Sequence, residues 1–251
     1  MDDKLSNLQK AMRILRMLGE KPYEYTASEI STVTGLNRTT VYRILNTLSG
    51  GDAVIQDALS KKFKVGPMIY HIGNAYLNNY SFKHEIISVL QEISDVVHES
   101  AGLAIRDGEN IISLFEVEMQ QPYKMNAQPG SLYPMNRGCY GKCLMAYNDQ
   151  HEVRRLLEKQ TFEKLFPHTL TGVEEILEEY RRIRAQGYVI SDGESYNPSA
   201  FGVGVPVRDE RGTVKACLAV AFIKGEHHEE KVNKCLSLLL QKAEELRRYI
   251  P

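Results

Sequence analysis

The chain has 251 residues, of which 43% are hydrophobic and 25% are charged, a composition typical of a soluble globular protein with room for two domains. The lack of an apolar run as long as a bilayer argues against a membrane protein, and the net charge of −1 taken over the whole chain does not favour a DNA-binding protein. The polar N-terminus and four cysteines without a disulfide-framework spacing predict a cytoplasmic protein.

Three short helices are predicted near the N-terminus. Thr26 and Glu29 form a capping box that starts the second helix, and Gly35 tolerates the positive φ needed at its end. Asn37 is a strong N-cap for the third helix. The apolar positions expected to face inward are Leu8, Met12, Leu15 and Leu18, then Ala27, Ile30, Val33 and Leu36, then Val41, Leu45 and Leu48. The pattern predicts a helix-turn-helix, although an αα-hairpin with solvated polar residues has the same form.

The outward face of the third helix is polar and basic, as a helix in the DNA major groove requires. Residues 53–57 and 61–65 then predict a β-hairpin whose lysines contact phosphate, which completes a winged helix. Residues 1–66 carry 10 Lys and Arg against 7 Asp and Glu, so positive charge is concentrated here. The predicted DNA-binding residues are Ser28, Arg38, Thr39, Thr40, Tyr42, Arg43, Asn46, Lys61 and Lys62.

The remaining chain predicts a linker helix and a second domain. Pro67 follows the hairpin and favours a helix start, so the expected domains are 1–66, a linker helix 67–81 and 82–251. Helices are expected at 84–98, 140–147, 150–158, 173–186 and 229–248, and strands at 103–105, 111–115, 201–207 and 214–222. The fold class is therefore α+β, with a C-terminal mixed antiparallel sheet flanked by helices and suited to a small-molecule pocket.

Several sequence segments resemble the IclR type of transcriptional regulator over essentially the whole chain. They are residues 8–15, 29–43 and 63–66 in the first part, and 134–146, 187–194 and 204–212 in the second. The resemblance implies a winged helix-turn-helix, a linker helix and a GAF-like effector domain. It also implies a homodimer or homotetramer on near-palindromic double-stranded DNA operators, control of catabolic genes, and neither a cofactor nor a membrane partner.

The resemblance further implies an effector pocket between the loop before the Gly141-Lys142 helix and the late strands. The residues carried over are Met135, Gly138, Cys139, Tyr140, Gly141, Ser191, Phe201, Leu218 and Val220. Backbone amides at the start of that helix suit a carboxylate. Three of the four late-strand positions are apolar, so the expected effector is a largely apolar or aromatic carboxylate.

Other functions remain open from the residues alone. A GAF-like domain with enzymatic activity would need a convergent nucleophile and base, and Cys139 beside Tyr140 lacks a base. RNA binding is disfavoured because no exposed aromatic platform is evident. The segment 138–142 lacks the frame of a phosphate-binding loop, and Cys139 with Cys143 has no further metal ligand at suitable spacing, so no metal site is expected.

Overall fold

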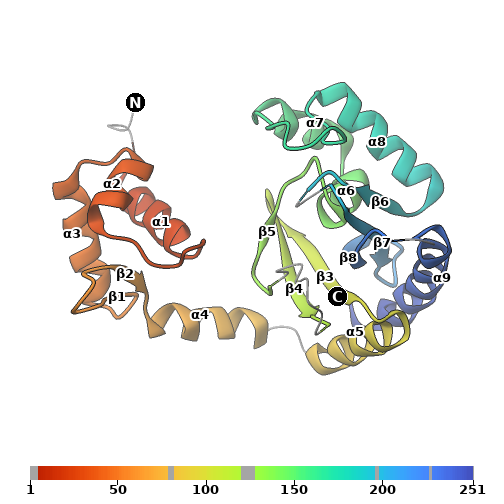
Figure 1. The fold of residues 1–251 in the computed structure, drawn as a ribbon, viewed down its shortest axis with the longest axis horizontal. Coiled ribbons are helices and arrows are strands. Elements are labelled where there is room, and N and C mark those ends of the chain that lie inside the picture. The colour runs from red at the N-terminus through yellow and green to blue at the C-terminus, as the bar shows by residue number, and fades with distance from the viewer. Residues whose placement is uncertain (1–4, 79–81, 120–127, 196–197, 226–227, 251) are drawn as a thin grey trace. The chain divides into compact units, whose positions relative to one another are not determined.

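A computed structural model describes residues 5–78, 82–119, 128–195, 198–225 and 228–250. The chain divides into two compact units, Met1–Ser81 and Phe82–Pro251 (Figure 1). The predicted linker segment 67–81 falls within the first unit, and its status as a separate part stays a prediction. Residues 79–81 lie outside the described part. Within that part, no helix combines the length and apolarity needed to cross a bilayer.

The first unit is a winged helix-turn-helix followed by a further helix. It comprises α1 (Asn7–Leu18), α2 (Ala27–Thr34), α3 (Arg38–Ser49), β1 (Val54–Gln56), β2 (Phe63–Val65) and α4 (Pro67–Asn78). Thr26 and Glu29 form the predicted capping box, and Gly35 ends α2 with φ 71°. The Asn37 side chain accepts a hydrogen bond from the Thr40 amide and so caps α3. The strands pair antiparallel as a short wing.

Two predictions about the core of this unit are wrong. Leu8 and Met12 are 73% and 60% exposed, because the buried face of α1 is formed by Ile14, Met17 and Leu18 instead. Val33 is 64% exposed, since α2 turns its other side to the core. The predicted stripes followed helical spacing, but the spacing alone did not determine which side of a short helix faces its neighbours.

The second unit contains a six-stranded antiparallel sheet in the order β5-β4-β3-β8-β7-β6. Its strands are β3 (Ser100–Asp107), β4 (Asn110–Val117), β5 (Leu132–Tyr133), β6 (Val189–Asp192), β7 (Ala200–Arg208) and β8 (Val214–Ile223). Its helices are α5 (Lys83–Val97), α6 (Cys139–Ala146), α7 (Gln150–Glu158), α8 (Val173–Gln186), α9 (His228–Leu246) and the 3-10 turn η2 (Arg247–Tyr249). The strands β5 and β6 were not predicted, because segments this short carry too little periodicity.

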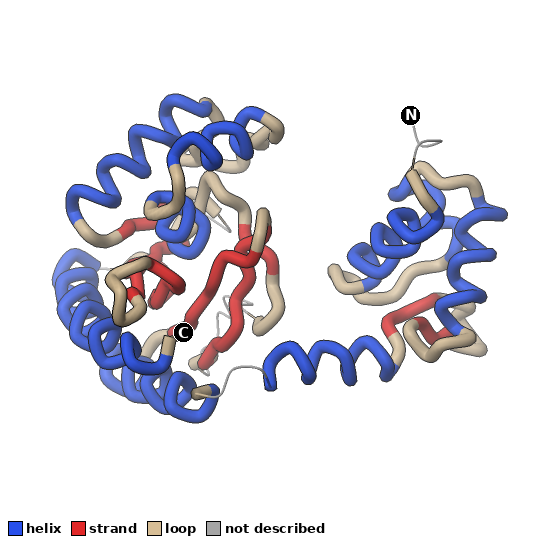
Figure 2. Tube along the Cα trace, turned by 180° about the vertical axis from the view of Figure 1, so that it is seen from behind, coloured by secondary structure: helices blue, strands red, loops and turns tan. Residues whose placement is uncertain are grey.

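Helices cover both faces of this sheet. Helices α5 and α9 lie together along one face, and α6 and α8 lie over the other (Figure 1). The same layering is visible from behind, with strands in red between blue helices (Figure 2). The apolar core between α6, α7, α8 and the sheet includes Cys217 and Ala219 of β8. Odd-numbered residues of β8 therefore face α6, and the even-numbered ones face α5 and α9.

Small residues occupy the sheet face below the start of α6. Gly102 of β3 pairs with Ala219, and Gly202 of β7 pairs with Ala221. A side chain at Gly202 would collide with the Cys139 sulfur, so glycine allows α6 to approach the sheet closely. These missing side chains leave space between the sheet and the loop that precedes α6.

Candidate functional site

The polar face of α3 is exposed to solvent. Five of the residues predicted to contact DNA are exposed on this helix: Arg38, Thr39, Tyr42, Arg43 and Asn46. The remaining predicted contacts lie nearby in the chain: Ser28 is exposed on α2, Thr40 is partly buried beside the cap of α3, Lys61 is exposed, and Lys62 is partly buried.

Two of these cations are held by partners that the sequence did not reveal. The Arg43 Nη2 donates a hydrogen bond of 3.2 Å to Asn7 Oδ1 at the start of α1. The Lys62 Nζ lies 2.8 Å from Glu24 Oε1, and this hydrogen bond raises the pKa of Lys62. Both partners are distant in sequence, so only the tertiary fold brings them together.

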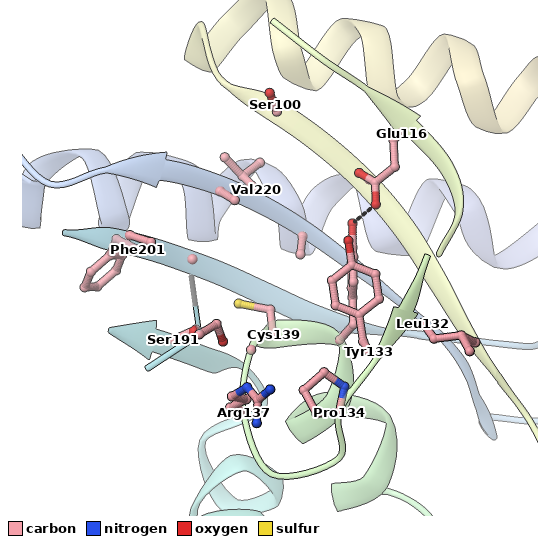
Figure 3. A pocket seen from close by; sticks show the side chains of 18 residues that line it. Ser100, Glu116, Leu132, Tyr133, Pro134, Arg137, Cys139, Ser191, Phe201 and Val220 are labelled. Carbon is pink, nitrogen blue, oxygen red and sulfur yellow. Dashed lines mark hydrogen bonds between the residues drawn. The ribbon is translucent and has the colours of Figure 1, made fainter. Parts of the chain in front are cut away.

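A cavity of about 230 Å³ lies between the sheet and the loop before α6 (Figure 3). Six of the nine predicted effector residues line it: Gly138, Cys139, Tyr140, Ser191, Phe201 and Val220. The other lining residues are Ser100, Gly102, Glu116, Leu132, Tyr133, Pro134, Arg137, Ser195, Ala200, Gly202, Ala219 and Ala221. The wall is mainly apolar, with a few polar groups placed at its edges.

Three predicted residues do not line the cavity. Leu218 lies on the α5 and α9 side of β8, one residue out of register with Ala219 and Ala221. Met135 is buried, and its carbonyl accepts a hydrogen bond of 2.8 Å from the Tyr180 hydroxyl. Gly141 packs against the Pro134 carbonyl, where no side chain fits. The cavity is apolar here largely because β7 and β8 present alanine and glycine, beside the larger Phe201 and Val220.

The partly buried Glu116 and the buried Tyr140 form a hydrogen-bonded pair at one end of the cavity. The Tyr140 hydroxyl donates a hydrogen bond of 3.0 Å to Glu116 Oε1, directly over Gly102. Burial raises the pKa of Glu116 to about 8, although hydrogen bonds from Tyr140 and Ser113 oppose the rise. Glu116 could not be predicted as a site residue from the sequence pattern, because only the pairing of β3 with β4 brings its carboxyl under α6.

A different set of polar groups lies at the other end. Arg137 is partly buried against the cavity, and no described residue forms a hydrogen bond or ion pair with its guanidinium. The Ser195 hydroxyl is buried and, within the described chain, also lacks a hydrogen-bond partner. Helix α6 starts there without a side-chain cap. In Figure 3, Arg137 and Glu116 lie on opposite sides of the cavity, with Cys139 and Tyr133 between them.

Lys142 fixes the loops around the cavity and does not enter it. Its Nζ lies 2.7 Å from Glu194 Oε1 and 3.1 Å from Glu179 Oε1, and it donates a hydrogen bond to the Ile190 carbonyl. Glu194 also accepts the Gly138 amide at 3.2 Å. All three ionic side chains are buried, and Lys142 compensates the charge of both carboxylates, with Arg182 as a second cation for Glu179. The interpretation of 138–142 as a phosphate loop is therefore not supported, since the lysine is fully engaged.

The cavity offers little to covalent chemistry. Burial raises the pKa of the Cys139 thiol, which keeps it protonated and weakly nucleophilic. All four cysteines are unpaired and buried. Across the described ranges, no group of three His, Cys, Asp or Glu side chains is arranged to hold a metal ion.

Comparisons with known proteins cover the whole chain. The profile of the IclR helix-turn-helix domain matches residues 7–58, and that of the bacterial transcriptional regulator IclR C-terminal domain matches 74–248. The HTH-type transcriptional regulator KdgR of Dickeya chrysanthemi is 27% identical over 237 residues, which cover 94% of this chain and 77% of that protein.

Solved structures show the same fold. An IclR transcriptional regulator from Alicyclobacillus acidocaldarius has a TM-score of 0.81 at 24% identity and covers 98% of this chain and 99% of its own. An IclR homologue from Microbacterium hydrocarbonoxydans, complexed with 4-hydroxybenzoate, has a TM-score of 0.74 at 20% identity. The match covers 96% of this chain and 98% of the homologue. With both domain profiles matched in order and the winged helix-turn-helix joined to a domain with an enclosed cavity, the chain belongs to the IclR family of transcriptional regulators.

Proposed function

We propose that this protein is a sequence-specific regulator of catabolic genes whose effector is a largely apolar or aromatic carboxylate. The observation that carries the effector class is the Arg137 guanidinium at the edge of a mainly apolar cavity, where none of the described residues pairs with it. A partly buried cation without a counter-charge favours an anionic ligand, and a carboxylate can bind it with a bidentate hydrogen bond.

The size of the cavity agrees with this effector. A cavity of roughly 150 Å³ can hold benzene, so about 230 Å³ accommodates one ring with one or two polar substituents. The Tyr133 ring meets the Tyr140 ring edge-on at 4.9 Å and supplies an aromatic wall. The likeness in fold to the homologue that was solved with 4-hydroxybenzoate agrees with the same class of ligand.

The DNA contacts follow from the first unit. Helix α3 presents Arg38, Arg43 and Asn46 as the base-reading residues, and the wing presents Lys61 and Lys62 to the phosphates. The effector regulates binding only if it favours one arrangement of the DNA-binding units over another. We place the protein in the cytoplasm, where its DNA lies.

Self-association as a homodimer or homotetramer is part of the proposal. Helix α4 buries none of its described residues, and Met68, Tyr70 and Ile72 are exposed on it. Apolar side chains on an unburied helix suit a contact with a second copy of the chain. Sedimentation equilibrium of the purified protein measures the state, and a monomer would contradict this part.

The proposal is tested by gel-shift titration on the DNA upstream of the protein's own gene, with excess random duplex as competitor. We expect a discrete shift that resists the competitor and changes when benzoate or a medium-chain carboxylate is added. Binding that random duplex removes completely would exclude sequence-specific regulation, and a shift that no carboxylate changes would exclude the effector class. Enzymatic action on the small molecule is disfavoured by the protonated Cys139 thiol.

A further inference from the structure

The polar groups of the cavity are divided between two separate places. Arg137, Ser195 and the uncapped start of α6 lie at one side, and Glu116 with the Tyr140 hydroxyl lies at the other. Figure 3 shows Arg137 and Glu116 separated by Cys139 and the Tyr133 ring. A ligand with a single polar group satisfies only one of these places.

The Glu116 end needs an explanation of its own. The side chain is partly buried beside the cavity, and its hydrogen-bond partners in the described structure are hydroxyl groups, not cations. One oxygen, Oε1, accepts the Tyr140 hydroxyl at 3.0 Å. Apolar packing alone would favour leucine or methionine at such a position, because a buried acid lowers stability unless something binds it.

Gly102 keeps this acid in place above the sheet. A side chain at residue 102 would overlap both the Glu116 carboxyl and the Tyr140 hydroxyl. The glycine therefore leaves room for the Glu116 carboxyl and the Tyr140 hydroxyl. It also weakens the packing of the strand, because glycine has no side chain. This arrangement is built around the carboxyl, and the carboxyl borders the cavity.

We propose that the effector has two polar ends: a carboxylate that binds Arg137 and Ser195, and a hydroxyl or amine that donates a hydrogen bond to Glu116. The apolar middle of the ligand lies over the glycine and alanine residues of β3, β7 and β8. This inference rests on the proposed function, because it assigns the effector to the same cavity. It adds a specificity determinant, Glu116, that selects against carboxylates without a second polar group.

The end of the ligand that binds Glu116 must donate a hydrogen bond, and either a hydroxyl or an amine can do so. The two groups differ in whether their binding releases a proton. A hydroxyl binds without changing the protonation of Glu116, which is mostly neutral near pH 7. An ammonium favours the carboxylate form, so its binding releases a proton to the buffer. Calorimetry in two buffers of different ionisation enthalpy separates them.

The test is isothermal titration calorimetry on the full chain with four probes: benzoate, 3-hydroxybenzoate, 4-hydroxybenzoate and 4-(aminomethyl)benzoate. We expect the best of the three substituted probes to bind about tenfold more tightly than benzoate, the value of one hydrogen bond to an acid. In Glu116→Leu that advantage over benzoate disappears, because leucine offers no hydrogen-bond acceptor. Glu109→Leu, at an exposed acid in the β3–β4 turn, is the matched control and keeps the advantage.

Each outcome decides one assignment. Equal affinities for all four probes in the wild type, or an advantage that survives Glu116→Leu, overturn the role of Glu116 and leave the proposed function intact. Arg137→Met is expected to weaken every carboxylate about tenfold or more, and an unchanged affinity overturns the carboxylate end. Failure of every probe to bind the wild type overturns the effector class and this inference with it. If Glu116→Leu does not fold, Glu116→Gln must abolish the preference for the amine.

Discussion

The pKa of Glu116 makes a prediction about stability that needs no ligand. In the unfolded chain this carboxyl ionises near its ordinary value of 4.5, but in the folded chain burial holds its pKa at about 8. Between these values the unfolded state has lost the proton and the folded state keeps it. The contribution of Glu116 to stability is therefore fully present below about pH 4.5 and is lost as the pH rises through about 8.

The magnitude follows from that interval. At about 1.4 kcal/mol per pKa unit, ionising Glu116 lowers the free energy of unfolding by at most about 5 kcal/mol once the pH exceeds 8. Between about pH 5 and about pH 8 the loss is about 4 kcal/mol, and water that enters the cavity reduces it. Glu116→Gln keeps the shape and the hydrogen bond with Tyr140 but cannot ionise, so it avoids this loss.

The assay is urea unfolding of wild type and Glu116→Gln from about pH 5 to about pH 8, followed by far-ultraviolet circular dichroism because the chain has no tryptophan. Other titrating groups affect both proteins equally and cancel in the difference between their free energies of unfolding. That difference is expected to shift in favour of Glu116→Gln by several kcal/mol across the range. A difference that stays constant with pH would refute the raised pKa of the Glu116 carboxyl.

Five further substitutions test other parts of the structure. Arg43→Ala should weaken operator binding by about 1–3 kcal/mol and random duplex much less, and equal losses on both in a gel shift would contradict base reading. Lys62→Ala should weaken all duplexes equally and flatten the salt dependence, whereas Glu24→Gln should strengthen them by freeing the lysine; unchanged salt slopes would exclude a phosphate contact. Gly102→Ala should destabilise the fold by roughly 1–3 kcal/mol in urea and lower effector affinity, because its methyl group overlaps the hydrogen bond above it. Lys142→Met should cost about 3–5 kcal/mol of stability, since the buried Glu194 loses its cation and Glu179 keeps only Arg182, and a loss below 1 kcal/mol would contradict that role.

Local rules account for most of what the sequence predicted correctly. Thr26, Gly35 and Asn37 act through atoms within a few residues, so their caps and turn were predictable without the fold. The same is true of α7 and α8, whose amphipathic patterns are long and regular.

What the sequence missed depends on tertiary pairing. Leu218 was assigned to the cavity, but a strand alternates faces, and an error of one residue moves a side chain to the opposite layer. Glu116 and Arg137 occupy ordinary-looking positions in the sequence, and only the packing of α6 on the sheet brings both to the wall of one cavity. Asn7 and Glu24 meet Arg43 and Lys62 for the same reason.

The alternation along β8 separates two kinds of mutational change. Leu218 has its side chain in the layer under α5 and α9, where a substitution disturbs core packing. Ala219 and Ala221 lie on the opposite face, where adding or removing a single methyl group alters the room left for the effector. New effector preferences can therefore arise by small steps along one face of a strand while the other face conserves the fold. This separation makes the domain a suitable starting point for evolving or engineering sensors of related small molecules.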